Sequence, residues 1–164
     1  MLRYEMQITL ICVGKIKEKF FKDAVDEYSK RLCRYCRLNI VEVADEMTPD
    51  GASDAQVDQI LAKEADRIIS KLPAGAHIIT LEIKGKELSS EELAAHIEAL
   101  GTGGVSHIVF IIGGSLGLHG KVIERADTHL SFSRMTFPHQ LMRVILLEQI
   151  YRSYRIINGE PYHK

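Results

Sequence analysis

The chain lacks the features that mark membrane and secreted proteins. Its 164 residues contain no tryptophan and no run of about 18 apolar residues, which is the length a membrane-spanning helix needs. The amino terminus also lacks the charged, apolar and small-residue succession of a signal peptide. We therefore expect a cytoplasmic protein without a membrane partner.

Cysteine is scarce, and its spacing favours neither a disulfide framework nor a metal site. Cys33 and Cys36 form the only closely spaced pair, with Cys12 as the third cysteine. A lone pair cannot complete a tetrahedral zinc site without further ligands, and the seven histidines do not show ligand spacing. We expect no metal, and we expect Cys33 and Cys36 to pack as ordinary small apolar residues.

The chain also lacks a large net charge of either sign, because its formal charge is −1. The charges are nevertheless unevenly placed: residues 1–37 carry a net +4, residues 38–133 a net −8 and residues 134–164 a net +3. If the fold brings both ends onto one face, that face could bind a polyanion. A merely uneven surface explains the same numbers equally well.

What the chain does contain is a regular alternation of strand-like and helix-like segments. Capping boxes at Ser53 with Gln56 and at Ser89 with Glu92 mark two helix starts. A turn is expected at 84–86. The strands are expected at 6–13, 38–43, 77–83, 105–112 and 128–132, and the helices at 20–36, 53–72, 89–100, 118–126 and 138–157. The pattern predicts one α/β domain with a mostly parallel sheet and helices on both faces.

Two loops follow the last two strands, and such loops are where open α/β sheets bind ligands. The first, 113–117, is glycine-rich, which lets the backbone approach a ligand closely. Its glycine spacing does not fit a dinucleotide fingerprint, and it lacks the lysine of a phosphate-binding P-loop. The second, 131–137, precedes Pro138 at a helix start. These loops predict a small ligand held mainly by backbone groups, without identifying it.

The last helix, 138–157, is apolar around most of its circumference. Glu148, Arg152 and Arg155 fall in one narrow arc shared with Leu141. A helix of this kind must be covered on more than one side, and in a chain this short the second cover is expected to be another subunit.

Four motifs resemble the ribosomal RNA large subunit methyltransferase H family of the SPOUT superfamily of knotted methyltransferases. They are TLEIKGK (80–86), FIIGGSLGL (110–118), LSFSRMTFPHQLMRVILLEQIYRSYRI (130–156) and PYHK (161–164). The resemblance covers residues 6–164 as a single domain and leaves 1–5 as an amino-terminal extension.

The resemblance implies a homodimer with a C-terminal trefoil knot that binds S-adenosylmethionine. It further implies methylation of N3 of a pseudouridine in 23S ribosomal RNA, on the assembled ribosome. By match to the family's motifs, the implied cofactor contacts are Leu81, Gly113, Phe132, Ser133, Arg134, Met135, Thr136 and Phe137.

Methyl transfer to an imide nitrogen requires that the nitrogen lose its proton, so a base or a stabilising charge is needed. The resemblance favours the tail residues Tyr162, His163 and Lys164 for this role, with His139 as an alternative base. We expect Arg143, Arg152 and Arg155 to contact RNA phosphates, although Arg152 could instead pair with Glu148.

Two other functional classes are open at this point. One is a non-catalytic ribosome or RNA-binding factor that retains the fold, and the other is a nucleotide-dependent oxidoreductase. The intact loops and tail argue against the first, and the absent dinucleotide fingerprint argues against the second. Binding of S-adenosylmethionine compared with NAD would separate the three.

Overall fold

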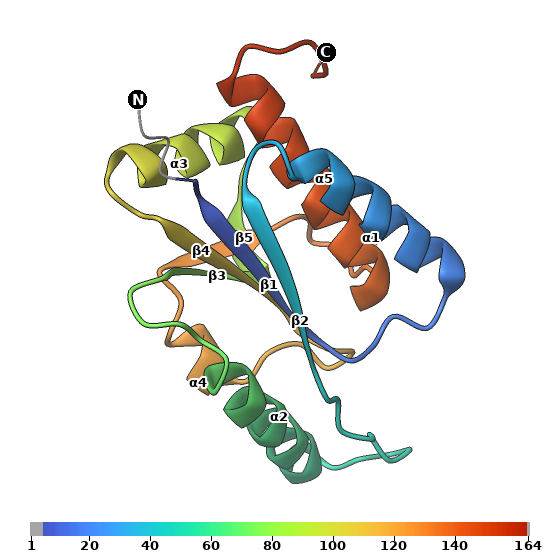
Figure 1. The fold of residues 1–164 in the computed structure, drawn as a ribbon. Helices are drawn as coiled ribbons and strands as arrows, with labels where there is room; N and C mark the ends of the chain where they lie inside the picture. Colours follow the sequence, from blue (N-terminus) through green and yellow to red (C-terminus); the bar gives the residue numbers. More distant parts are fainter. Residues whose placement is uncertain (1–4, 164) are drawn as a thin grey trace.

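The computed structural model describes residues 5–163, and its elements alternate as the sequence predicts (Figure 1). Lys164 and most of the predicted extension 1–5 lie outside the described part. In chain order the elements are β1 (Gln7–Val13), α1 (Lys19–Leu32), β2 (Arg37–Val43), α2 (Asp54–Ile69), β3 (His77–Glu87), α3 (Ser90–Thr102), β4 (His107–Ile112), α4 (Gly120–Ile123), β5 (Thr128–Ser131) and α5 (His139–Ile157).

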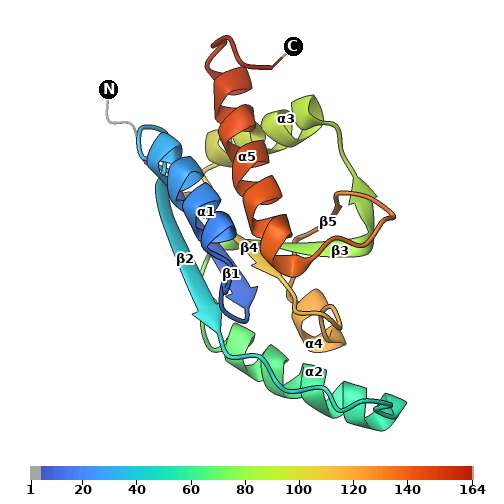
Figure 2. The same ribbon diagram turned by 90° about the vertical axis from the view of Figure 1, so that its right-hand side faces the viewer.

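The five strands form one sheet in the order β2-β1-β4-β3-β5, and every neighbouring pair is parallel. Helices α1, α3 and α5 cover one face and α2 and α4 cover the other, as Figures 1 and 2 show. The predicted fold class is confirmed. Because all strands are parallel, their carboxyl ends lie at one edge of the sheet, where a ligand is expected.

The sheet is buried on both faces, which accounts for the continuous apolar runs of its central strands. In β1, Leu10 and Cys12 pack with α1, α3 and α5, whereas Ile11 and Val13 pack with α2 and α4. All four side chains are at most 1% exposed. Of the two paired cysteines, Cys36 is buried as expected and Cys33 is exposed, because it follows the last residue of α1.

Strand β3 departs from the prediction. The expected turn at 84–86 lies inside the strand, where the register with β5 shifts between Leu81 and Lys86. A Cβ on Gly85 would lie 2.8 Å from the carbonyl carbon of Leu130. Only glycine therefore allows β5 to pass this close, and β3 resumes its pairing beyond the irregularity. The shift makes the predicted turn a bulge-like segment instead of the end of a strand.

The helix starts follow the sequence signals closely. Both predicted capping boxes form, with Ser53 accepting from the Gln56 N–H and Ser89 accepting from the Glu92 N–H. Helix α4 is shorter than the predicted 118–126, since only one turn is helical. In the described part of the chain, no helix combines the length and apolar character needed to cross a membrane.

Candidate active site

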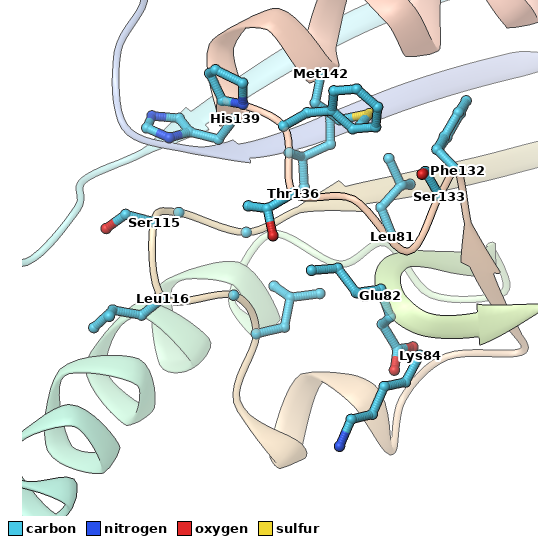
Figure 3. Close-up of a pocket in the computed structure, with 18 of the residues that line it drawn as sticks. Leu81, Glu82, Lys84, Ser115, Leu116, Phe132, Ser133, Thr136, His139 and Met142 are labelled. Carbon is cyan, nitrogen blue, oxygen red and sulfur yellow. The ribbon is translucent and has the colours of Figure 1, made fainter.

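A cavity of about 930 Å³ opens at the carboxyl ends of β3, β4 and β5. Its walls come from three segments, 81–84, 112–118 and 132–139, with Ile123 and Met142 completing the lining (Figure 3). Parallel strands that end at the same edge bring these segments together, although they are far apart in the sequence. The two loops predicted to hold a ligand therefore face one another across one cavity.

The glycine loop after β4 is shaped by its own backbone. A Cβ on Gly113 would lie 2.5 Å from the carbonyl oxygen of Gly117, a distance that real Cβ atoms essentially never show. Gly117 itself has φ of +86° and donates its N–H to the Gly114 carbonyl at 3.1 Å. We expected these glycines to make room for a ligand, and they are also required by the tight turn of the loop itself.

The loop after β5 is tied to the segment after Leu81. The Ser131 hydroxyl donates to the Ile83 carbonyl at 2.9 Å, and the Ser133 hydroxyl accepts from the Met135 N–H at 3.0 Å. Pro138 is the N-cap residue of α5, so the helix begins where the cavity wall ends. These contacts hold two of the three walls in a fixed relation.

The cavity gathers nearly all of the residues predicted to contact the cofactor. Arg134 is the exception, because it is exposed and does not line the cavity. The lining residues among those predicted are Leu81, Gly113, Phe132, Ser133, Met135, Thr136 and Phe137.

Glu82 is a cavity residue that the sequence reasoning did not single out. One of its carboxylate oxygens accepts from the Thr80 hydroxyl at 2.5 Å and lies 2.5 Å from Nδ1 of His129. The carboxylate is held in place by Thr80 of the same strand and by His129, which the pairing of β3 with β5 brings alongside it. Its position directly after Leu81, at the end of the buried part of β3, is the signal by which it could have been found.

His139 lies at the rim of the same cavity, one helical turn before Arg143 (Figure 3). Burial lowers the pKa of His139, and the positive charge of Arg143 lowers it further, against an opposing effect of Asp45. At neutral pH the imidazole is therefore uncharged and able to accept a proton.

Arg143, which we expected to contact RNA, lies inside the chain. Its side chain is 1% exposed, and its guanidinium donates to a carboxylate oxygen of Glu42 at 2.6 Å and to the Gly14 carbonyl at 2.7 Å. Arg143 therefore fastens α5 to the ends of β1 and β2. The sequence could not reveal this, because Glu42 is 101 positions away.

The C-terminal tail packs against the other end of α5. The Tyr162 hydroxyl donates to Glu148 at 3.1 Å, and the tyrosine ring meets Tyr151 edge to face. His163 lies between Glu91, at 2.6 Å from Nε2, and Arg152, at 3.2 Å from Nδ1.

The two other arginines expected to bind RNA also have partners inside the chain. Arg152 pairs with Glu148 at 2.5 Å, and Arg155 pairs with Glu160 and donates to the Pro161 carbonyl at 2.9 Å. Arg152 lies ten residues beyond the cavity residue Met142, which is about 15 Å along the helix axis. Within one chain, the tail and the cavity are therefore separate (Figure 2).

Nearly the whole chain matches known methyltransferases. The family model described as "Predicted SPOUT methyltransferase" matches residues 6–163. A curated relative from Bifidobacterium adolescentis, "Ribosomal RNA large subunit methyltransferase H", is 64% identical over 159 residues, which are 97% of this chain and 100% of the relative. "Ribosomal RNA large subunit methyltransferase H 1" of Clostridium perfringens is 57% identical over the same shares of the two chains.

A solved structure, that of a probable methylase family protein from Haemophilus influenzae, shares the fold. It covers 98% of this chain and 71% of its own with a TM-score of 0.53, at 12% sequence identity. This likeness supports the fold alone. On the family match and the identities of the curated relatives, the chain belongs to the SPOUT methyltransferase family, among the large-subunit ribosomal RNA methyltransferases H.

Proposed function

We propose that this protein uses S-adenosylmethionine to methylate N3 of a pseudouridine in 23S ribosomal RNA, on the assembled ribosome in the cytoplasm. The observation that carries the proposal is the cavity at the strand ends, where the loops of a methyltransferase family meet around a glycine backbone. The C-terminal trefoil knot that the family implies belongs to the same proposal.

The cavity residues fit this cofactor in size and chemistry. The side chains of Leu81, Phe132 and Phe137 offer an apolar surface for an adenine ring, and Gly113 offers backbone groups without a side chain. Glu82 and Lys84 both belong to the lining, which suits a ligand that carries groups of both charge signs. When bound, S-adenosylmethionine would supply an electrophilic methyl group on a sulfonium sulfur.

The protein's own task is to hold the base and remove the proton from N3. Burial, together with the nearby charge of Glu148, raises the pKa of Tyr162 to about 12, so its hydroxyl remains protonated. We therefore assign Tyr162 to stacking or hydrogen bonding with the target base, and we assign His163 and Lys164 to deprotonation or to stabilising the resulting anion.

The contacts of His163 define how it could act as a base. The Glu91 carboxylate can only accept, so Nε2 carries the proton and the lone pair of Nδ1 faces Arg152. Nδ1 becomes free to accept a proton when Arg152 turns away, for example to an RNA phosphate. Arg152 and Arg155 would then contact RNA by leaving their internal partners, so RNA binding and catalysis would be coupled.

A second subunit would bring the tail to a cavity. Along α5, the half-buried side chains of Leu141, Ile145 and Ile156 lie on one stripe with the Glu148–Arg152 pair between them. An apolar stripe interrupted by one neutralised pair suits a twofold contact with a second copy. In such a homodimer, the tail of one subunit would complete the cavity of the other.

The proposal is tested by mass spectrometry of 23S ribosomal RNA from cells that lack the gene, with and without the wild-type copy. One N3-methylated pseudouridine should disappear and return. Calorimetry on the purified protein should show binding of S-adenosylmethionine and not of NAD. A protein that binds ribosomes but leaves the methylation pattern unchanged would instead be a non-catalytic ribosome-binding factor.

A further inference from the structure

We propose that the corner between β1 and α1 holds the RNA strand that flanks the target nucleotide. We call Lys15, Lys17, Phe20 and Lys22 the basic corner. The inference rests on the proposed function, and it answers a question that the structure raises. The three arginines expected to grip RNA are engaged inside the chain, so other cations must provide the first contact with phosphates.

The lysines of the basic corner are exposed and available. Among residues 5–163, no carboxylate lies within 4.0 Å of the ammonium groups of Lys15, Lys17 or Lys22, whereas neighbouring Lys19 pairs with Asp23. Residues 15–22 contain four lysines and one glutamate, a net charge of +3 in a chain whose net charge is −1. Such a group suits a polyanion better than a neutral surface.

The placement of these charges opposes the stability of helix α1. The start of a helix carries partial positive charge, so lysines there are unfavourable and acidic residues are favourable. Helix α1 has no acidic residue in its first turn, and its N-cap residue Glu18 makes no side-chain cap bond. Helices α2 and α3 both begin with complete capping boxes. Helix α5 also begins without a side-chain cap, but it has no lysine in its first turn, whereas α1 has Lys19 and Lys22 there. Lysines at an uncapped helix start are a local cost, which indicates that a function selects these residues.

Phe20 adds an aromatic surface to the basic corner. Its side chain is 63% exposed, although it lies within 4.4 Å, centroid to centroid, of the ring of Phe21. An exposed aromatic ring among lysines is the arrangement with which proteins bind single-stranded RNA, since the ring stacks on a base while the lysines contact phosphates. The target nucleotide of a base-modifying enzyme must also leave its stack, so its neighbours need such a surface.

The basic corner is fixed beside the cavity. The Lys17 N–H donates to Oε1 of Gln140 at 3.1 Å, and Gln140 follows the cavity residue His139. The Arg143 guanidinium donates to the Gly14 carbonyl at 2.7 Å. The backbone is therefore bonded to the first turns of α5 at both residue 14 and residue 17. The views in Figures 1 and 2 agree that the connection between β1 and α1 passes beside this end of α5. An RNA strand on the basic corner would therefore pass the mouth of the cavity.

The test compares two sets of variants in the full-length protein. K15Q/K17Q/K22Q and F20A alter the basic corner, and K30Q/K71Q removes two exposed lysines near the opposite edge of the sheet. Binding to purified 23S ribosomal RNA is measured across salt concentrations, and methyl transfer is measured with ribosomes from cells that lack the gene. Calorimetry with S-adenosylmethionine and sedimentation verify the cofactor site and the oligomeric state.

We expect the triple variant to raise KM for ribosomes at least about tenfold and to reduce the salt slope of RNA binding by about two, because each lost phosphate contact contributes roughly 0.7–0.9. F20A should weaken binding roughly tenfold with an unchanged slope, since stacking involves no ion release. In both cases kcat and cofactor affinity should stay near wild type. K30Q/K71Q should resemble wild type throughout.

An unchanged KM and slope in the triple variant would overturn the inference, and so would an equal loss in K30Q/K71Q. Conversion of F20A to monomers would assign Phe20 to a subunit contact and would also overturn it. The proposed function fails separately: a wild type that neither binds S-adenosylmethionine nor methylates, yet binds RNA through the basic corner, would leave this inference standing.

Discussion

The two ends of α5 use their polar groups in opposite ways. At the C-terminal end, Glu148, Arg152, Tyr162 and His163 form a connected network on the helix surface. At the amino-terminal end, the helix contributes His139 to the rim of an open cavity, and no side chain caps its first turn. Nearly saturated contacts at one end and an open cavity at the other are consistent with a tail that acts on a second subunit.

The largest expected effect comes from removing the C-terminal tail, which packs against the C-terminal end of α5. Deleting residues 162–164 should reduce methyl transfer to ribosomes by about 10²–10⁴-fold, because an acid–base group and a base-stacking ring are lost. Cofactor affinity and dimerisation should remain near wild type, as measured by calorimetry and sedimentation. Normal turnover in the truncated protein would transfer the catalytic role to His139. Loss of the cofactor or the dimer would make the tail a structural clamp.

The role of the cavity, which lies at the amino-terminal end of α5, is tested by adding a single methyl group to its glycine loop. Gly113→Ala should lower affinity for S-adenosylmethionine at least about tenfold, because the added Cβ cannot fit at 2.5 Å from the Gly117 carbonyl oxygen and the loop must move. Gly120→Ala is the matched control, since nothing lies within 4 Å of a Cβ there. Equal calorimetric affinity in the two variants would remove the glycine loop from the site.

The ion pairs at the two ends should differ in their contribution to stability. Arg143→Met should lower the free energy of unfolding by about 2 kcal/mol, which is below the value for a fully buried pair because Glu42 is 38% exposed. Arg152→Met removes an i,i+4 pair at the helix surface and should cost less than about 1 kcal/mol. Urea denaturation measures both. A larger loss for Arg152→Met would reverse the proposed division between a structural and a functional arginine.

The smallest expected effect is a pH dependence. Because burial lowers the pKa of His139 below its ordinary 6.5, the unfolded chain binds that proton more readily than the folded chain. The free energy of unfolding should therefore fall as the pH drops below 6.5, and it should fall less in His139→Gln. Denaturation at about pH 7.5 and about pH 5.5 compares the two proteins. Identical pH dependence would mean that His139 is not held neutral by its surroundings.

The sequence predicted most of the fold because its signals were local. The capping boxes at Ser53 and Ser89 and the apolar runs of the central strands each act within a few residues. The conformation of residues 84–86 was not predictable from local signals. Glycine is needed at position 85 because the backbone of Leu130, in another strand, leaves no room for a Cβ. The same reason explains why the bulge-like segment was read as a turn.

The sequence predicted the loops of the candidate site, but it did not predict the positions of the charged residues Glu82 and Arg143. The positions of the loops around Gly113 and Thr136 after two strands indicated a ligand site, and the resemblance to a family named the ligand; the structure brings these loops into one cavity. Arg143 looked like a surface cation in a helix, because its partner Glu42 is distant in sequence. Glu82 was overlooked because His129, one of the two side chains that hold its carboxylate, meets it only through the pairing of β3 with β5.

The most direct test of the account is complementation between two inactive subunits. One variant carries Gly113→Val, which damages the cavity, and the other lacks residues 162–164. If each tail completes the cavity of its partner, a heterodimer contains one intact site. An equimolar mixture refolded or coexpressed together should then recover about a quarter of wild-type methyl transfer, because about half of the dimers are mixed and each has one working site of two. Mixed dimers that form but stay inactive would contradict the account.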